Sequence, residues 1–146
     1  MAALQDFDHA LRDSAGADGD AWADEGVVFV GRLAAALSDD ELELLGLIWS
    51  DRPLLWQRHC AEVLGQARHV QAIKVLLDFV DRAKPEVARA ALESLSEFDP
   101  GLLAPEQSRR IVAAIEALVA RPVGPLHLVL LEKFLTRLRP AGAPVE

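Results

Sequence analysis

The sequence predicts an all-α protein, a short right-handed α-solenoid of about eight helices. Three observations lead to this prediction. Alanine and leucine are abundant and β-branched residues are scarce, which favours helix. Apolar residues recur at helical spacing through most of the 146 residues. Finally, residues 56–64 and 87–95 align with each other at an offset of 31 residues, and a period of that size is typical of stacked helical repeats.

The N-terminal part predicts two helices separated by a loop. Apolar residues at helical spacing indicate a short amphipathic helix over residues 3–13. Two glycines and small polar residues over 14–20 favour a loop. The helical pattern resumes from Asp20 to about Leu37, although glycines within it weaken the helix. Residues 27–30 alone would also suit a buried strand, but no second strand is predicted to pair with it.

The clearest local signal is a capping box at the start of the next helix. Ser38 can accept a hydrogen bond from a free backbone N–H of the first turn, and Glu41 can accept one in return. This helix is expected to end at residues 50–53. Proline favours the first turn of a helix, so a new helix is predicted from Pro53 to Gly65, where the glycine would act as a C-cap.

Residues 68–82 are predicted to form the central helix. Its polar residues fall within a strip roughly 100° wide, and most of the remaining circumference is apolar. A helix of this kind lies between neighbours, as an inner solenoid helix does. Further helices are predicted over 85–98, 105–120 and 126–138. Residues 1–139 are therefore expected to form one domain, and residues 140–146 a flexible tail.

The segment 56–95 resembles a HEAT repeat. It has an arginine near the start of the first helix (Arg58), a leucine–glycine end (Leu64-Gly65), a second helix, and then a proline turn with an apolar residue and another arginine (Arg89). The paired positions at the offset are Arg58 with Arg89, Glu62 with Glu93, Leu64 with Leu95, and Cys60 with Ala91. The resemblance implies an α-solenoid over about 40 residues. It implies nothing specific about function.

Charge and composition narrow the classes of partner. The formal net charge is −8, from 23 acidic and 15 basic side chains. Such a chain repels nucleic-acid phosphates and anionic lipids and suits a basic partner protein. The N-terminus has no secretory signal, and no stretch reaches the ~20 apolar residues of a membrane span. Because Cys60 is the single cysteine, a disulfide within the chain is excluded and a cytoplasmic location is expected.

Motifs for catalysis or metal binding are weak. Cys60 has no CxxC partner, and it aligns with an alanine of the repeat. His59 precedes it, but adjacent helical residues point roughly 100° apart, so a structural cysteine is predicted. The histidines lack metal-ligand spacing: His9, His59, His69 and His127. No cofactor or metal is therefore predicted, and the chain is not expected to be an enzyme.

A partial calcium-loop pattern occurs in the first predicted loop. Asp18, Asp20 and Asp24 are spaced like the first ligands of such a loop. However, Trp22 stands where a third ligand is required, and no downstream glutamate falls in place. A solvated loop is the favoured interpretation.

Two features are candidate binding surfaces. The first is the polar strip of the central helix with its neighbours, although a merely solvated face would show the same residue types. Its predicted partner-binding residues are Asp40, Glu43, Gln71, Lys74, Asp78, Arg82, Arg109 and Glu116. The second is the pair Trp49 and Trp56. Tryptophan is frequent in interface hot spots, but at repeat positions packing is the favoured interpretation.

These features favour a small, non-catalytic interaction protein. An acidic chain of this size with degenerate helical repeats resembles the immunity proteins that bacteria pair with polymorphic toxins. The resemblance implies that the chain binds and neutralises a basic toxin domain, as a monomer or a homodimer. One alternative is a HEAT-like enzyme of the DNA glycosylase type, which the charge and the few aromatics oppose. Another is a general scaffold or chaperone subunit.

Overall fold

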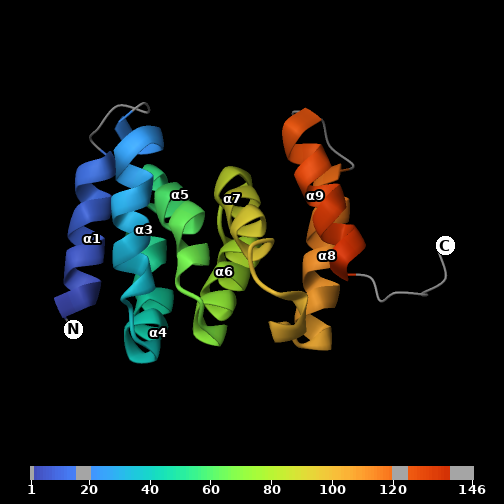
Figure 1. Ribbon diagram of the computed structural model, residues 1–146, viewed down its shortest axis with the longest axis horizontal. Coiled ribbons are helices and arrows are strands. Elements are labelled where there is room, and N and C mark those ends of the chain that lie inside the picture. The colour runs from blue at the N-terminus through green and yellow to red at the C-terminus, as the bar shows by residue number, and fades with distance from the viewer. Residues whose placement is uncertain (1, 16–20, 120–124, 139–146) are drawn as a thin grey trace.

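The computed structural model describes residues 2–15, 21–119 and 125–138, and every element within these ranges is helical (Figure 1). The predicted tail, residues 140–146, lies outside them. Eight α-helices occur in the described ranges, with a π-helical turn (η1) and three 3₁₀ turns (η2–η4). Their bounds are α1 Ala2–Ala15, η1 Trp22–Gly26, α3 Val27–Ala35, α4 Asp39–Ile48, η2 Trp49–Asp51, α5 Leu54–Val63, η3 Leu64–Gln66, α6 Val70–Arg82, α7 Pro85–Leu95, η4 Pro100–Leu102, α8 Pro105–Val119 and α9 Pro125–Leu138.

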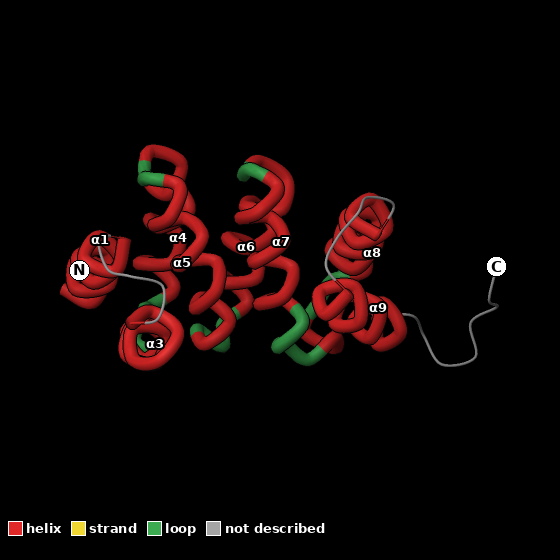
Figure 2. Tube along the Cα trace, turned by 90° about the horizontal axis from the view of Figure 1, so that it is seen from above, coloured by secondary structure: helices red, strands yellow, loops and turns green. Residues whose placement is uncertain are grey.

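The helices pack in two adjoining rows. In one row α3 contacts α5, α5 contacts α7, and α7 contacts α9. In the other, α4 contacts α6 and α6 contacts α8. Helix α1 packs on α3, α4 and α5 and so covers one end of both rows. Figure 2 shows α1 and α3 at one end of the molecule and α8 and α9 at the other. The prediction of an all-α fold is confirmed.

Polar contacts connect successive helices at a regular sequence separation. Three of them join the row of α4, α6 and α8, and a fourth joins the segments that follow α5 and α7. The separations lie near the 31-residue offset of the aligned segments. The contacts are Trp49–Asp78, Arg68–Glu97 and Arg110–Asp81, each 29 residues apart, and His69–Asp39.

The capping box at the start of α4 is present as predicted. Glu41 N donates to Ser38 Oγ at 3.2 Å, and Ser38 N donates to Glu41 Oε1 at 3.1 Å. Glu41 does more than the sequence indicates, because its other oxygen accepts the backbone N–H of Leu4 at 2.6 Å. The same carboxylate therefore caps α4 and satisfies a free N–H in the first turn of α1.

Of the predicted helix over residues 20–37, residues 21–35 are helical, with an irregular turn among them. Residues 22–26 form a π-helical turn, and α3 continues from Val27. The interpretation of 27–30 as helix rather than strand is confirmed. A Cβ on Gly26 would lie 2.9 Å from the Trp22 ring. The glycine thus allows the indole to lie directly against the backbone of the π turn.

Gly65 is not the helix C-cap that the sequence predicts. Helix α5 ends at Val63, and Gly65 lies in the following 3₁₀ turn without a left-handed backbone conformation. A Cβ at this position would lie 3.2 Å from the Ser94 carbonyl oxygen and would collide with the Glu97 side chain. The position requires glycine because the segment after α7 approaches closely there.

The repeat positions form the centre of the core. Cys60 and Ala91, which are equivalent in the aligned segments, are both fully buried. Trp49 and Trp56 are also buried, so the packing interpretation of these tryptophans is correct. Val70 differs from its prediction. The sequence places it on the apolar circumference of the central helix, but it is 51% exposed at the first turn of α6.

Candidate functional site

The eight predicted partner-binding residues all lie on the row formed by α4, α6 and α8. Asp40 and Glu43 are exposed on α4, and Arg109 and Glu116 are exposed on α8. The remaining four lie on α6, between these two helices. Of these, Lys74 and Arg82 are exposed, and Gln71 and Asp78 are half-buried.

Two of these residues are engaged in the packing of α6 on α4. Asp78 accepts hydrogen bonds from Trp49 Nε1 and from Arg82 Nη1, both at 2.9 Å. The Arg82 guanidinium lies 5.3 Å from the centre of the Trp49 ring, which places a cation near a π face. Because these contacts hold both charges within the protein, Asp78 and Arg82 contribute to structure as well as to the surface.

An apolar stripe accompanies the predicted acidic residues on α4. Asp40, Glu43, Leu44 and Leu47 stand at positions i, i+3, i+4 and i+7, so they share one helical face. Leu47 is 74% exposed and Leu44 is 36% exposed. In the sequence, both leucines are ordinary apolar positions of a helix. The spacing alone identifies a face, but it does not show that this face is turned to solvent.

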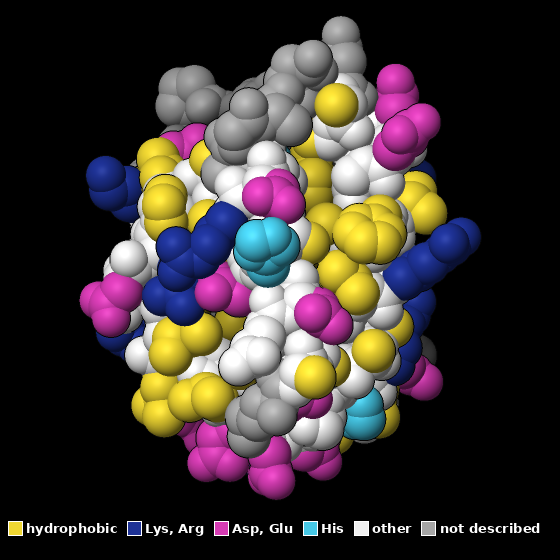
Figure 3. All heavy atoms as spheres, turned by 90° about the vertical axis from the view of Figure 1, so that its left-hand side faces the viewer, with side chains coloured by type: hydrophobic (Ala, Val, Ile, Leu, Met, Phe, Trp, Pro, Cys, Tyr) yellow, Lys and Arg dark blue, Asp and Glu magenta, His cyan; other side chains and the backbone are white. Residues whose placement is uncertain are grey.

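A second candidate site is a groove of about 660 Å³ between α1 and the η1–α3 segment. Its floor is apolar and includes Ala10, Val30 and Leu33. Its rim carries carboxylates from α1 and from η1. His9 also lies on the rim, with its Nε2 3.7 Å from an oxygen of Asp13. Figure 3, which looks onto this end of the molecule, shows acidic, basic and hydrophobic side chains around a histidine. The acidic rim residues are Asp6, Asp13 and Glu25.

The wall of the groove is fixed by Trp22 and His59. Their rings are stacked, with centroids 3.8 Å apart and planes 9° from parallel. Trp22 Nε1 donates to Glu62 Oε2 at 2.7 Å, and Arg58 Nε donates to the other Glu62 oxygen at 3.3 Å. Burial lowers the pKa of His59, with the Glu62 charge opposing and the Arg58 charge assisting this shift. A neutral imidazole is therefore held under the indole.

Ser14 completes this buried cluster. Its Oγ lies 2.9 Å from His59 Nδ1 and donates to the Leu11 carbonyl at 2.8 Å. In the tautomer that carries Nδ1–H, the imidazole donates to Ser14 Oγ while the hydroxyl donates to the Leu11 carbonyl. The two contacts of Ser14 connect the His59 ring on α5 to the backbone of α1.

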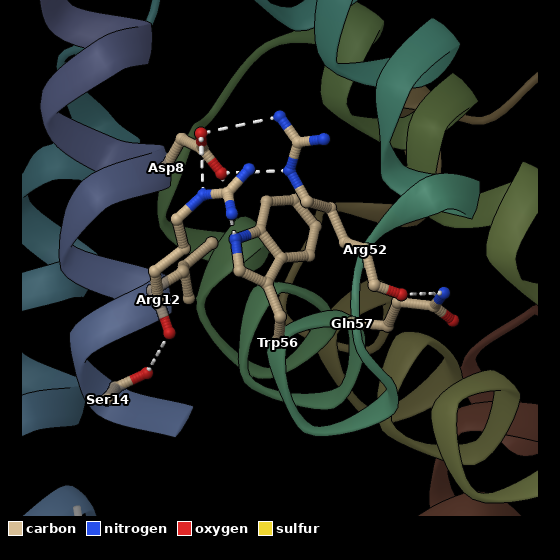
Figure 4. Close-up of polar contacts among 7 residues, drawn as sticks. Asp8, Arg12, Ser14, Arg52, Trp56 and Gln57 are labelled. Carbon is tan, nitrogen blue, oxygen red and sulfur yellow. Dashed lines mark hydrogen bonds and ion pairs between the residues drawn. The ribbon is translucent and has the colours of Figure 1, made fainter. Parts of the chain in front are cut away.

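Helix α1 is attached to α5 by a charged cluster centred on Asp8 (Figure 4). Trp56 Nε1 donates to Asp8 Oδ1 at 3.0 Å, and Arg52 contacts both carboxylate oxygens, at 3.0 and 3.3 Å. Arg12 Nε donates to Oδ2 at 3.2 Å. Burial alone would raise the pKa of Asp8, but the hydrogen bonds from Arg52 and Arg12 outweigh it and hold that pKa below its usual value.

The remaining sequence candidates for chemistry are Cys60 and the possible metal ligands. Cys60 is fully buried, and burial raises the pKa of its thiol, so it packs in the protonated form. Over residues 2–15, 21–119 and 125–138, no three His, Cys, Asp or Glu side chains group closely enough to hold a metal ion. Asp18 and Asp20 of the calcium-loop pattern lie outside these ranges. No helix in the described part of the chain is long and apolar enough to cross a membrane.

Comparison with known proteins adds no homologue. A scan against the profiles of known protein families, a search of curated proteins and a search of solved structures each found no match to this chain.

Sequence reasoning missed the cluster of Ser14, Trp22 and His59. The Ser14–His59 contact joins residues 45 positions apart and the Trp22–His59 contact joins positions 22 and 59, and no spacing rule connects such positions. One signal was available in the sequence. A tryptophan four residues before a glycine suggests close approach of a large ring to the backbone, but it does not identify the partner of that ring.

Proposed function

We propose that this chain is a non-catalytic protein-binding module whose α4 face docks a partner. The observation that carries the proposal is the exposed stripe of Leu44 and Leu47 beside Asp40 and Glu43. Apolar residues at this spacing normally face a core. When such a stripe is exposed and flanked by charge, a partner surface is the usual occupant.

We further propose that the two rows form a short right-handed α-solenoid of the HEAT type. The packing of each helix on the next in its row supports this proposal. So do the polar contacts 29 residues apart, because each connects equivalent parts of successive units. The predicted strip on α6 would then lie next to the α4 stripe on one continuous surface.

The partner that best suits this surface is a basic protein domain. The stripe carries carboxylates, and the whole chain has a net charge of −8, so a basic surface would be attracted and oriented during encounter. An immunity protein that neutralises a cognate bacterial toxin domain in the cytoplasm has these properties. The acidic α4 face opposes the alternative of a nucleic-acid enzyme, because it would repel phosphates.

Co-purification with the product of the neighbouring open reading frame tests the proposal. We expect a stoichiometric complex with the unaltered chain. Leu47→Arg should weaken the complex by at least about tenfold, because a cation would replace an apolar contact. Leu102→Arg is the matched control, since Leu102 is 47% exposed on η4, away from α4. The proposal is contradicted if no complex forms, or if neither substitution changes the affinity of the complex.

A further inference from the structure

We propose that the groove between α1 and α3 binds an amphipathic helix that presents two cations beside an apolar stripe. This inference goes beyond the proposed function by adding a second binding surface, and it rests on the chain being a protein-binding module. It concerns a different surface from the α4 face, at the end of the molecule that α1 covers.

The charges of the groove define the cationic part of this ligand. Asp6, His9, Ala10 and Asp13 stand at positions i, i+3, i+4 and i+7 of α1, so both aspartates point toward the same side. Glu25 adds a carboxylate from the opposite wall. None of the described residues that line the groove is a lysine or arginine. The lining therefore attracts cations and offers no charge for an anion.

The apolar floor defines the other part of the ligand. Phe29 is 58% exposed and lines the groove together with the half-buried Leu33, which lies one helical turn further along α3. A purely polar cation such as a polyamine would leave the Phe29 ring and the exposed part of Leu33 in contact with water. A ligand that carries leucine-type side chains next to its cations would cover them, which stabilises the complex in proportion to the apolar area buried.

The spacing of the aspartates indicates the secondary structure of the ligand. Asp6 and Asp13 are seven residues apart on α1, which corresponds to roughly 10 Å along the helix axis. Two arginines seven residues apart on a docked helix have the same spacing. They would meet both aspartates while the intervening apolar stripe lies on the floor. A guanidinium is favoured over an ammonium because it binds a carboxylate through two parallel hydrogen bonds.

The groove is built as a rigid surface. The π turn over residues 22–26 brings Trp22 into the wall, where stacking on His59 and the bond to Glu62 hold it. π turns of this kind occur frequently at functional sites. A second copy of this chain is a poor occupant, because it would bring a net charge of −8 to an acidic rim.

Peptide titration monitored by NMR tests this inference. The probe is a 14-residue helical peptide with leucines along one face and arginines at two positions seven apart. Its controls are a twin with glutamates in place of the arginines and a scrambled peptide without an apolar face. Binding is followed through the Trp22 indole N–H resonance, which is assigned by its loss in Trp22→Phe. We expect the arginine peptide to bind at least about tenfold more tightly than either control.

Charge-matched variants locate the site. Asp6→Asn with Asp13→Asn should weaken the arginine peptide by at least about tenfold, and Phe29→Ala should weaken it about fivefold. Asp40→Asn with Glu43→Gln removes the same charge from α4 and should change binding less than about twofold. These three variants alter exposed side chains, so far-ultraviolet circular dichroism should remain unchanged.

Several outcomes would overturn the inference. The first is that the arginine peptide does not bind at about 1 mM, and the second is that the scrambled peptide binds as tightly as it does. The third is that the α4 variant loses as much affinity as the groove variant. The fourth is that spermidine at the same concentration displaces the arginine peptide. The assay does not use the neighbouring gene product. A failure of the groove is therefore distinguishable from a failure of the proposed function, which the co-purification measures.

Discussion

Helix α1, at one end of the molecule, is attached by different contacts from those that join α5 and α7 at the centre. Between α5 and α7 the contact is made by small, fully buried residues such as Cys60 and Ala91, with Gly65 at the closest approach. Helix α1 also buries apolar side chains, Leu4, Phe7 and Leu11, but polar bonds add to this packing: the Asp8 cluster, the Ser14–His59 bond and the Leu4–Glu41 bond. The centre is thus stabilised mainly by close packing of small residues, and the α1 end by packing together with several bonds to charged groups.

The largest loss of stability is expected when a buried side chain at the centre is truncated. Phe79 is fully buried on α6 and lies against Trp49, with ring centroids 4.5 Å apart. Phe79→Ala should lower the free energy of unfolding by about 3–5 kcal/mol. Chemical denaturation should show one cooperative transition at lower denaturant concentration. A change below about 1 kcal/mol would show that the centre is not the tightly packed part.

A smaller and more local effect is expected at the α1 end. Asp8→Ala leaves Trp56 Nε1 and the Arg52 guanidinium without their acceptor, which should cost about 1–3 kcal/mol. Hydrogen exchange should accelerate in α1 and less in α6 and α7. The comparison fails if the amides of α7 accelerate as much as those of α1.

The helix cap provides a third test. Ser38→Ala removes the acceptor for Glu41 N while leaving Glu41 bonded to Leu4 N. The expected cost is about 1 kcal/mol, as for other N-caps. Urea denaturation of this variant and of Ser50→Ala, an exposed serine on the adjoining η2, would measure it. Equal stability of the two variants would contradict a role for the capping box.

The smallest effect concerns pH. The folded-state pKa of His59 lies below its usual 6.5 because burial opposes the charged imidazole. The unfolded chain therefore binds more protons than the folded chain between these two values, and stability falls as pH drops through 6.5. The pKa values of Asp8 and Glu41 are also lowered, so their contributions are lost at still lower pH. Urea denaturation at a series of pH values should show the free energy of unfolding falling on acidification, and His59→Gln should remove the step near pH 6.5. A step that persists in His59→Gln would rule out this histidine as its source.

Sequence patterns predicted the helices well because their signals are local. The capping box at Ser38 and the proline at the start of α7 each act within one turn, and both are present. The π turn was not predicted, since Trp22 within it stacks on His59, which lies on α5 and is distant in the sequence. The role of Gly65 was predicted wrongly, because the residue that requires a glycine there, Ser94, lies on another helix.

The candidate surfaces were predicted less completely. Helical periodicity placed Asp40 and Glu43 on the row of α4, α6 and α8. It did not reveal that Leu47 is exposed beside them, because an apolar position in a helix does not specify which neighbour covers it. The groove between α1 and α3 was also missed, since its two acidic walls come from separate helices that only the packing brings together.

Hydroxyl-radical footprinting of the complex with the neighbouring gene product tests the central claim, that the α4 face is a docking surface. Leu47 is 74% exposed and Leu102 is 47% exposed in the free chain, so both should be oxidised readily. In the saturated complex, oxidation of Leu47 should fall at least about fivefold while Leu102 remains unchanged. Undiminished oxidation of Leu47 in a saturated complex would contradict the claim.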